Sequence, residues 1–284
     1  MVNPMDHPLR NRLVLITGGG RGIGRVYAEH LASKGARMVL AARSADELDD
    51  VASAIEADGG SASSYPVDVT DAVAVRHLID RVEDEKGPID VLINNAGTRG
   101  PIANAWECQW EEWWQAIQVN LGGAAAFSHA VIPRMAARRR GTVVNIVSEA
   151  GVYRWPTLSA YSVSKAALIK FSENVALECR DVSVSVFAYH PGLLPIGLAT
   201  EAMNVPASAT LAEARVAAWF RAQLNTDAAA SPEASARQLV SLLSGAYDGL
   251  TGRYISVHDD LDLLVERVGN PVAAKDYRML RAGA

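Results

Sequence analysis

The sequence predicts an α/β fold in which helices cover both faces of a parallel β-sheet. Short apolar runs rich in branched residues alternate with amphipathic segments of helical length, which is typical of βαβ units. The chain has 284 residues, of which 49% are hydrophobic and 21% charged, as in globular proteins with a large buried core. We therefore expect a single domain over residues 1–284.

The predicted elements follow one another without room for a linker. Apolar runs predict strands at 13–16, 38–41, 91–93, 142–147 and 182–188. Amphipathic segments predict helices that include 23–33, 46–57 and 72–85. Two stretches depart from this alternation: residues 192–226 are alanine-rich and irregular, and a tail from residue 258 is rich in Asp and Leu.

Charge and hydropathy exclude several classes of partner. The formal net charge of -5 argues against a nucleic-acid partner, and we interpret the basic run 138–140 as a solvated helix end rather than a phosphate site. No uninterrupted apolar run approaches the roughly 20 residues that span a bilayer, so we expect no membrane partner. Residues 1–12 lack the apolar segment of an export signal, which predicts a cytoplasmic location. Cys108 and Cys179 have no C-x-x-C spacing, and we expect both to be small buried side chains.

A glycine-rich turn follows the first predicted strand. Residues 13–26 read LVLITGGGRGIGRV, a strand, a turn and the start of a helix. Such a unit forms an anion site, because unpaired backbone N–H groups and the helix dipole point at the turn and glycines let a pyrophosphate approach. Gly18, Gly22 and Gly24 give the spacing G-x-x-x-G-x-G, which differs from the usual dinucleotide fingerprint G-x-G-x-x-G. From the turn alone, a dinucleotide site and a tight turn without a ligand both remain open.

Further motifs accompany the turn. After TGGGRGIG the chain contains, in order, Val67-Asp68-Val69, Asn94-Asn95-Ala96-Gly97, Tyr161-x-x-x-Lys165 and Pro191-Gly192. With these motifs in this order and spacing, the chain from Asn11 to Val257 resembles the short-chain dehydrogenase/reductase family. The resemblance implies one doubly wound Rossmann-type domain of about seven parallel strands, with a nicotinamide cofactor across their carboxyl ends. Residues 258–284 then form a C-terminal tail.

Tyr161 and Lys165 have a spacing that supports proton chemistry. Because they are four residues apart, they share one face of a helix. A phenol with its ordinary pKa of about 10 is a poor acid–base catalyst at neutral pH, whereas a nearby ammonium and the cofactor's positive ring favour the phenolate and lower that pKa. The resemblance adds Ser148, which hydrogen-bonds the substrate oxygen, and Asn120, which completes a proton relay through water to the lysine. The predicted catalytic residues are Asn120, Ser148, Tyr161 and Lys165.

Each catalytic assignment has a structural alternative. Ser148 is also suited to cap a turn or helix, and Asn120 to satisfy buried backbone groups. A Tyr–Lys pair at helical spacing is common on a protein surface.

The end of the second predicted strand favours NADP(H) over NAD(H). An NAD enzyme places Asp or Glu about 20 residues after the glycine turn, whereas this chain has Ala42 followed by Arg43 and Ser44. Arg43 and Arg21 offer planar cationic donors for a 2′-phosphate. The resemblance extends the contacts to the adenine, the ribose and the nicotinamide. The predicted cofactor-binding residues are Gly18, Arg21, Gly22, Ile23, Gly24, Arg43, Ser44, Asp68, Val69, Asn94, Ala96, Gly97, Tyr161, Lys165, Pro191 and Gly192. One position departs from the family: Ile196 stands where a Thr often binds the carboxamide.

The residues expected around a substrate are mostly apolar. By the resemblance, Tyr153, Trp155 and the loop from Leu193 through Met203 toward Trp219 enclose the pocket, which favours a hydrophobic ketone or secondary alcohol. Arg99 and Arg154 either bind a carboxylate or are solvated.

Other clusters receive structural interpretations. Trp110, Trp113 and Trp114, with Ile117, follow a helical stripe that predicts packing in the core or at a subunit interface, and the resemblance implies a homodimer or homotetramer. His258 and the aspartates after it lack metal-ligand spacing, so we expect no metal and a polar turn there. A structural role is expected for His190.

The sequence therefore predicts an NADP(H)-dependent oxidoreductase with a small-molecule carbonyl or alcohol substrate and Tyr161 as general acid/base. An NAD-dependent alcohol dehydrogenase of the same family and a catalytically idle NADP-sensing protein remain as alternatives. An idle protein would normally have lost Tyr161 or Lys165, and both are present.

Overall fold

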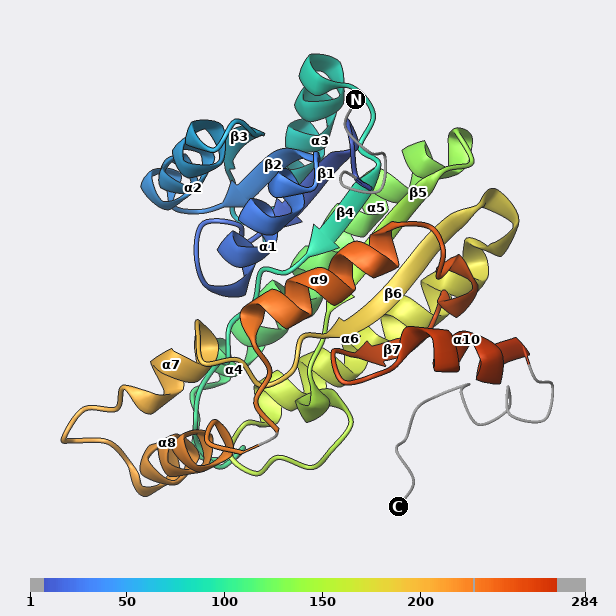
Figure 1. Cartoon of the computed structure of the whole chain (residues 1–284). Helices are drawn as coiled ribbons and strands as arrows, with labels where there is room; N and C mark the ends of the chain where they lie inside the picture. Colours follow the sequence, from blue (N-terminus) through green and yellow to red (C-terminus); the bar gives the residue numbers. More distant parts are fainter. Residues whose placement is uncertain (1–7, 227, 270–284) are drawn as a thin grey trace.

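A seven-stranded sheet runs through the protein (Figure 1). The structure, a computed structural model, describes residues 8–226 and 228–269. Every neighbouring pair of strands is parallel. In spatial order the strands are β3 (Ser61–Pro66), β2 (Arg37–Ala42), β1 (Leu13–Thr17), β4 (Val91–Asn94), β5 (Gly141–Ile146), β6 (Val184–His190) and β7 (Tyr254–Ser256). Because the strand order reverses between β1 and β4, a crevice is expected outside the carboxyl ends of these two strands.

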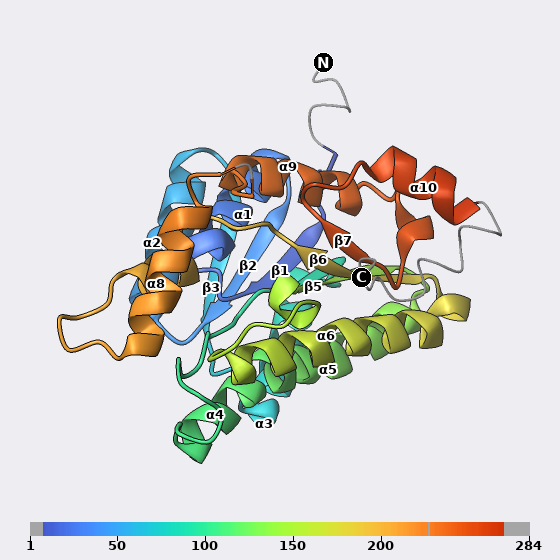
Figure 2. The same cartoon turned by 90° about the horizontal axis from the view of Figure 1, so that it is seen from below.

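Helices cover both faces of the sheet, as Figure 2 shows. One face carries α1 (Gly22–Ser33), α2 (Ala45–Ala57) and α9 (Pro232–Leu243), and the other carries α3 (Ala72–Lys86), α5 (Ala124–Ala137) and α6 (Ser159–Glu178). Strand β1 supplies both cores: Val14 and Ile16 pack with α1, whereas Leu13 and Leu15 pack on the opposite side. The sheet is thus buried on both faces, which explains the nearly continuous apolar runs in the sequence. This doubly wound α/β architecture confirms the predicted fold class.

The strands and helices predicted from the residues lie within two positions of those observed. Two strands were missed. Strand β3 is the polar edge segment SASSYP, and β7 has only three residues at the opposite edge. The prediction that residues 192–226 are irregular was wrong, because they contain α7 (Leu198–Met203) and α8 (Leu211–Gln223). Thr210 and Glu213 form a capping box that begins α8.

The basic run 138–140 lies at the end of α5 as expected, with Arg139 and Arg140 exposed, but it also makes specific contacts. Arg138 forms an ion pair with Glu83 and donates to the Ile89 carbonyl, and Arg140 forms an ion pair with Asp90. Two of the three arginines therefore connect the end of α5 to α3 and to the start of β4.

The tryptophan stripe lies on the surface and not in the core. It belongs to α4 (Trp110–Ile117), where Trp110 and Trp114 are exposed and Trp113 is half-buried. The Trp110 ring stacks on those of Trp113 and Trp114 at 5.6 and 5.7 Å between centroids. The Trp113 indole N–H donates to Ser159 Oγ at 3.0 Å, which joins α4 to the start of α6. The prediction of core packing was wrong, and packing at a subunit interface stays a prediction.

The C-terminal segment forms the expected polar turn and then a helix. Asp260 Oδ1 accepts hydrogen bonds from the N–H groups of Asp262 and Leu263 at the start of α10 (Leu261–Gly269). Within residues 8–226 and 228–269, no group of three or more His, Cys, Asp or Glu side chains is arranged to hold a metal ion. No helix in the same part of the chain has the length and apolar character needed to cross a membrane. Cys179 is buried as expected, whereas Cys108 is only partly buried. The remainder of the predicted tail, residues 270–284, lies outside the described residues.

Candidate active site

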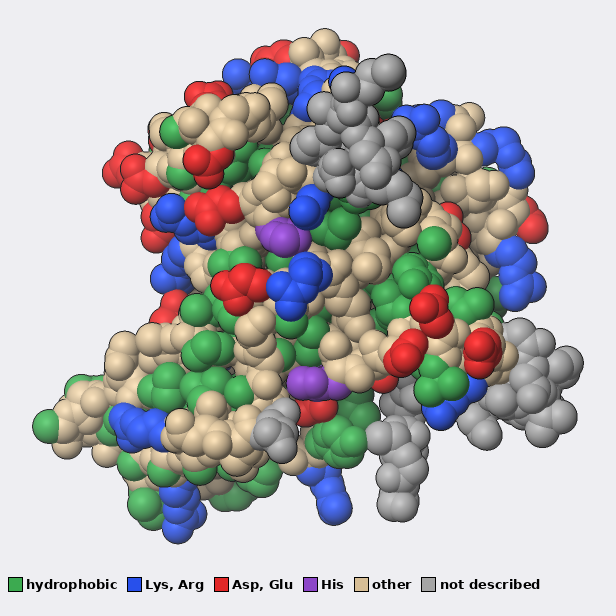
Figure 3. Space-filling view, viewed as in Figure 1, with side chains coloured by type: hydrophobic (Ala, Val, Ile, Leu, Met, Phe, Trp, Pro, Cys, Tyr) green, Lys and Arg blue, Asp and Glu red, His purple; other side chains and the backbone are tan. Residues whose placement is uncertain are grey.

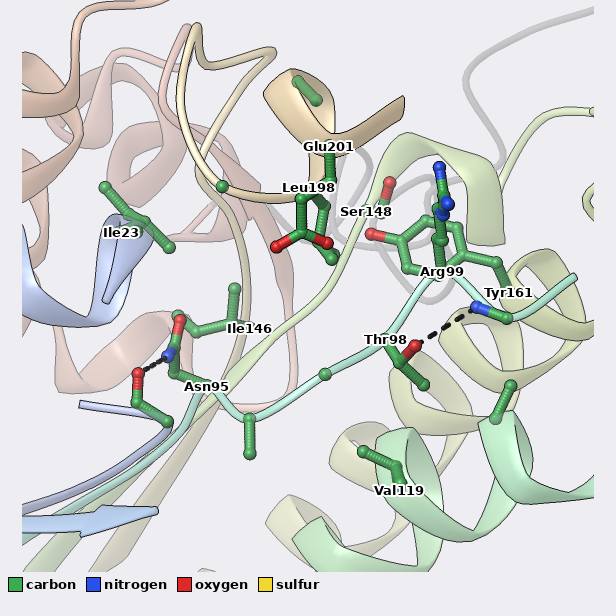
Figure 4. A pocket seen from close by; sticks show the side chains of 18 of the residues that line it. Ile23, Asn95, Thr98, Arg99, Val119, Ile146, Ser148, Tyr161, Leu198 and Glu201 are labelled. Atoms are coloured by element: carbon green, nitrogen blue, oxygen red, sulfur yellow. Dashed lines mark hydrogen bonds between the residues drawn. The ribbon is translucent and has the colours of Figure 1, made fainter. Parts of the chain in front are cut away.

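A cavity of about 1040 Å³ opens at the carboxyl ends of the strands. Figure 4 shows its two ends, with Ile23 and Asn95 at one and Ser148 and Tyr161 at the other. Of the cofactor-binding and catalytic residues predicted from the sequence, all except Asn94 and Asn120 line this cavity. The fold therefore brings together motifs that are spread over more than half of the chain.

The glycine turn connects β1 to α1 and has the backbone shape expected of an anion site. Gly18 and Gly22 have φ values of +65° and +56°, a conformation that favours glycine. A Cβ atom on Gly24 would lie 2.0 Å from the Gly18 carbonyl oxygen, so only glycine lets the turn approach the helix. Arg21, the residue that precedes α1, provides no side-chain cap for the helix. The turn thus leaves space and uncapped N–H groups of the kind that a pyrophosphate occupies.

Two polar residues that sequence reasoning did not assign hold the turn in place. Thr17 Oγ1 accepts hydrogen bonds from the N–H groups of Asn95 and Ala96, each at 3.0 Å. The Asn95 side-chain amide donates to the carbonyl oxygens of Thr17 and Gly18 at 2.9 and 3.1 Å. A signal for both was available, since a polar residue ends the apolar run of β1 and Asn95 follows β4 directly.

The adjoining end of the cavity carries the predicted phosphate-binding residues. Arg43 and Ser44 follow β2 and line the cavity, and Ser44 Oγ accepts from the Glu47 N–H at 3.4 Å as the N-cap of α2. Arg21 also lines the cavity but forms an ion pair with Glu201 of α7 at 3.0 Å. Because both of these side chains are substantially exposed, this ion pair contributes little to stability.

The segments after β3 and β4 form the middle of the cavity. Asp68, Val69, Ala96 and Gly97 line it. The pKa of Asp68 is lowered, chiefly because its carboxylate accepts a hydrogen bond from the Thr70 N–H and also because Arg43 is nearby.

Asn94, predicted to contact the cofactor, does not line the cavity. Its side chain is buried and donates to Asn145 Oδ1 at 2.8 Å and to Ser128 Oγ at 3.1 Å. Strand alternation directs Asn94 into the core between β4, β5 and α5. The next residue, Asn95, lines the cavity instead.

Tyr161 and Lys165 lie in the first turns of α6 and share a face, as their spacing predicts. The Lys165 Nζ atom lies 5.7 Å from the centroid of the Tyr161 ring and donates to the Ile146 carbonyl at 2.7 Å. Ser148, just beyond β5, accepts a hydrogen bond from the Ala150 N–H at 3.2 Å, so its capping role is also real. Figure 4 shows the hydroxyl groups of Ser148 and Tyr161 side by side.

Burial dominates the protonation of this pair. It raises the pKa of Tyr161, and the hydrogen bond with Ser148 offsets only part of that effect. Burial also lowers the pKa of Lys165 to about 8. The expected lowering of the tyrosine pKa is therefore not produced by the protein groups alone. A positively charged nicotinamide ring would supply the missing stabilisation of the phenolate.

Asn120 lies behind the cavity wall in a π-helical turn, Gln118–Gly123. Its side chain accepts from the Thr98 N–H at 2.7 Å and donates to the Thr98 carbonyl and to Ser164 Oγ, both at 2.8 Å. A Cβ atom placed on Gly97 would lie 3.3 Å from Asn120 Oδ1 and 3.7 Å from Lys165 Nζ. The side chain thus fixes the segment in front of Lys165 and has its hydrogen bonds satisfied by protein groups. A π turn often occurs at functional sites.

The chain after β6 covers the cavity from the other side. Pro191, Gly192 and Ile196 line it, and Gly192 has a φ of +86°. Gly197 packs against the glycine turn, since a Cβ on Gly22 would lie 3.4 Å from the Gly197 Cα. Helix α7 begins directly after this contact.

The catalytic end of the cavity is mostly apolar. Ile102, Leu158, Ala202 and Val216 form a buried cluster, and Tyr161 packs against it. Figure 3 shows apolar side chains gathered on the surface over α7 and α8. Trp155 lines the cavity, with its ring 4.6 Å from that of Trp219 between centroids. Tyr153 and Arg154, in contrast, are exposed and do not line it. Trp219 does not line it either, but packs on Trp155 and Phe220, which do.

Sequence comparison agrees with this geometry. A family model described as short chain dehydrogenase matches residues 12–204. The chain belongs to the short-chain dehydrogenase family. A relative, "Short chain dehydrogenase pigC" of Monascus ruber, is 33% identical over 271 residues, which cover 93% of this chain and 84% of the relative. Like other members of this family, the protein is an oxidoreductase that acts on alcohol or carbonyl groups with a nicotinamide cofactor.

Two solved structures of the family resemble the protein closely. NAD⁺-bound xylitol dehydrogenase superposes with a TM-score of 0.78 at 27% identity, covering 87% of this chain and 98% of that one. Actinorhodin polyketide ketoreductase with NADPH also has a TM-score of 0.78, at 26% identity, covering 87% of this chain and 95% of that one. One neighbour thus carries NAD⁺ and the other NADPH.

Proposed function

We propose that this short-chain dehydrogenase transfers hydride between NADP(H) and a hydrophobic ketone or secondary alcohol, with Tyr161 as the general acid/base. The observation that carries the proposal is one cavity lined by the glycine turn at one end and by Ser148, Tyr161 and Lys165 at the other. A dinucleotide bound along this cavity supplies the hydride at the catalytic end. The whole chain acts as one domain.

In the reductive direction, the protein's residues bind and protonate the substrate oxygen. Ser148 donates a hydrogen bond to the carbonyl and holds it against Tyr161. Tyr161 then gives its phenolic proton to the oxygen as negative charge develops there. Lys165, as an ammonium, stabilises the resulting phenolate, and Asn120 supports the relay that returns a proton. Val216 and Phe220 of α8 exclude water from the apolar part of the cavity.

The preference for NADP(H) rests on charge at the end of β2. Ala42 supplies no carboxylate to repel a 2′-phosphate, and Arg43 follows it in the cavity wall. Arg21 has Glu201 as an ion-pair partner, so Arg43 is the principal cation for the phosphate. An NAD-dependent alcohol dehydrogenase is the alternative, and an NAD⁺-bound structural neighbour is consistent with it.

We also propose a homodimer or homotetramer whose interface includes the exposed indoles of α4, Trp110 and Trp114. A cytoplasmic location is also part of the proposal.

A cofactor-oxidation screen tests the function. Purified protein is mixed with NADPH or NADH and a panel of apolar ketones, and loss of cofactor absorbance is followed. We expect turnover of at least one ketone, with kcat/KM at least tenfold higher for NADPH. Turnover that prefers NADH would support the NAD-dependent alternative. Cofactor binding without turnover of any ketone would support the idle sensing protein.

A further inference from the structure

We propose that Arg99 binds a carboxylate of the substrate, so that the enzyme acts on a hydrophobic ketone or secondary alcohol that carries an acidic group. This inference rests on the proposed function and specifies its substrate class. It assigns the two halves of such a molecule to two parts of the cavity: the apolar cluster and Arg99.

Arg99 belongs to the catalytic end of the cavity. It follows β4 by a few residues and lines the cavity. Figure 4 shows it at the same end as Ser148 and Tyr161, away from Ile23 and Asn95. A substrate held by Ser148 and Tyr161 therefore lies beside Arg99.

The backbone on both sides of Arg99 is fixed. Both polar backbone groups of Thr98 are bonded to the Asn120 side chain, at 2.7 and 2.8 Å. Gly100 has a φ of +66°, and a Cβ there would lie 2.8 Å from the Ala116 Cβ. An arginine that extends from a fixed backbone loses less conformational freedom on binding than one on a mobile loop.

Arg99 is the cation left for a substrate. In the described part of the chain, four cationic side chains line the cavity: Arg21, Arg43, Lys165 and Arg99. The first two lie at the glycine-turn end, and Lys165 donates to the Ile146 carbonyl. Among residues 8–226 and 228–269, Arg99 takes part in no hydrogen bond or ion pair, so its planar donors remain for a carboxylate.

The acidic residues of the cavity do not neutralise Arg99 by direct contact. Glu201 forms its ion pair with Arg21. Glu213 accepts hydrogen bonds from the Thr210 N–H at 2.7 Å and from the Thr210 hydroxyl at 3.0 Å. These hydrogen bonds are the main cause of its lowered pKa, and the charge of Arg99 is a minor one. Glu112 is exposed on α4, where water and salt screen its charge.

The apolar neighbours of Arg99 define the remainder of the ligand. Ile102 and Leu158 are buried, and Trp155 packs against them. An aromatic or aliphatic body fits this cluster while its carboxylate pairs with Arg99. Partial exclusion of water strengthens such a pair relative to one on an open surface.

Three keto acids, each compared with its uncharged methyl ester, test the proposal. The probes are benzoylformate, para-acetylbenzoate and β-benzoylpropionate, each with its methyl ester, measured with NADPH and with NADH. The acids place the carboxylate at different distances from the carbonyl. For at least one pair we expect kcat/KM of the acid to exceed that of the ester by about 10- to 100-fold, the range for a charge-assisted hydrogen-bonded pair.

Variants separate Arg99 from general electrostatics. Arg99→Gln should reduce the acid-to-ester ratio by about 10- to 100-fold. Arg99→Lys should fall between the parent and Arg99→Gln, because lysine keeps the charge but not the planar fork. Arg154→Gln is the matched control: Arg154 is exposed and outside the cavity, so the ratio should not change. An acid-to-ester ratio that Arg99→Gln changes by less than about threefold for every pair would overturn the proposal.

A binding measurement keeps the two proposals distinguishable. If no ketone is reduced with either cofactor, the proposed function is contradicted, but the proposal about Arg99 is not yet decided. Calorimetric titration of the parent and of Arg99→Gln with benzoate and benzamide then decides about Arg99. Loss of benzoate binding in Arg99→Gln supports the anion site, and equal binding in both proteins overturns it.

Discussion

Arg43 follows β2 and lines the cavity, and its charge is the basis of the proposed cofactor preference. NADPH carries one more phosphate than NADH, and a charge-assisted hydrogen bond contributes about 1.5–3 kcal/mol. Arg43→Ala should therefore weaken NADPH binding about ten- to a hundredfold and leave NADH binding nearly unchanged. Fluorescence titrations of parent and variant with both cofactors measure this. An equal loss for both cofactors would mean that Arg43 does not bind the phosphate.

His190 makes the stability of the protein depend on pH. Burial lowers its pKa to about 4, and the nearby His258 and Lys165 contribute to the lowering. The Nε2 atom lies 3.9 Å from Glu149, and the imidazole stacks on Tyr254. Because the folded pKa lies below the unfolded value of about 6.5, the unfolded chain binds the proton first as pH falls. Between about pH 6.5 and 4, His190 should thus cost up to about 3 kcal/mol of stability.

Thermal unfolding at several pH values checks this effect. His190→Gln removes the titrating group, so its Tm should fall less steeply than that of the parent between about pH 6.5 and 4. Identical slopes for the two proteins would contradict a buried neutral imidazole.

The positions of functional side chains were predictable from the sequence where a motif fixes both the residue type and the direction in which the side chain points. Elsewhere the predictions were less accurate. Tyr161 and Lys165 follow from helical spacing, and the glycines from the shape of the turn. Asn94 was misplaced because neighbouring residues at a strand end point to opposite sides, and the motif alone does not say which of Asn94 and Asn95 enters the cavity. The ion pair between Arg21 and Glu201 depends on α7, which no sequence pattern places near the glycine turn.

At the scale of elements, the π turn Gln118–Gly123 positions the wall of the site through Asn120. Asn120→Ala leaves both polar backbone groups of Thr98 without this partner and removes one from Ser164. Buried groups left unpaired cost about 1–3 kcal/mol each, and we expect the free energy of unfolding to fall by about 2–4 kcal/mol after relaxation. Gln118→Ala, on the exposed side of the same turn, should change it by less than about 0.5 kcal/mol.

Urea unfolding of both variants measures these differences. Equal stability of Asn120→Ala and Gln118→Ala would show that the asparagine does not hold Thr98 in solution.

Elements were predictable where burial dictates their composition. Strands β1, β2, β4, β5 and β6 are covered on both sides, so their apolar runs are visible in the sequence. Strand β3 is an edge strand whose serines tolerate water, and its pattern carries no such signal. Helices α7 and α8 are rich in alanine and bury only two residues each, which explains the mistaken prediction of an irregular segment.

For the whole molecule, the proposed assembly depends on the exposed indoles of α4. Trp110 and Trp114 are 63% and 45% exposed, which is unusual for tryptophan unless a partner covers it. Multi-angle light scattering at micromolar concentration should give a dimer or tetramer. Trp110→Glu with Trp114→Glu should shift the protein toward the monomer, whereas Val73→Glu, at an exposed position on α3, should not. A monomeric parent protein would refute the proposed interface.

Tyr161 is proposed to donate the proton to the substrate in the same cavity that binds the cofactor. The most direct measurement compares the parent and Tyr161→Phe for NADPH affinity and for kcat on the best ketone of the screen. Because the ring is kept and only the hydroxyl is lost, NADPH affinity should stay within about threefold, whereas kcat should fall by roughly 10²–10⁴-fold, the usual contribution of a general acid. A variant that retains kcat within threefold of the parent would contradict the account.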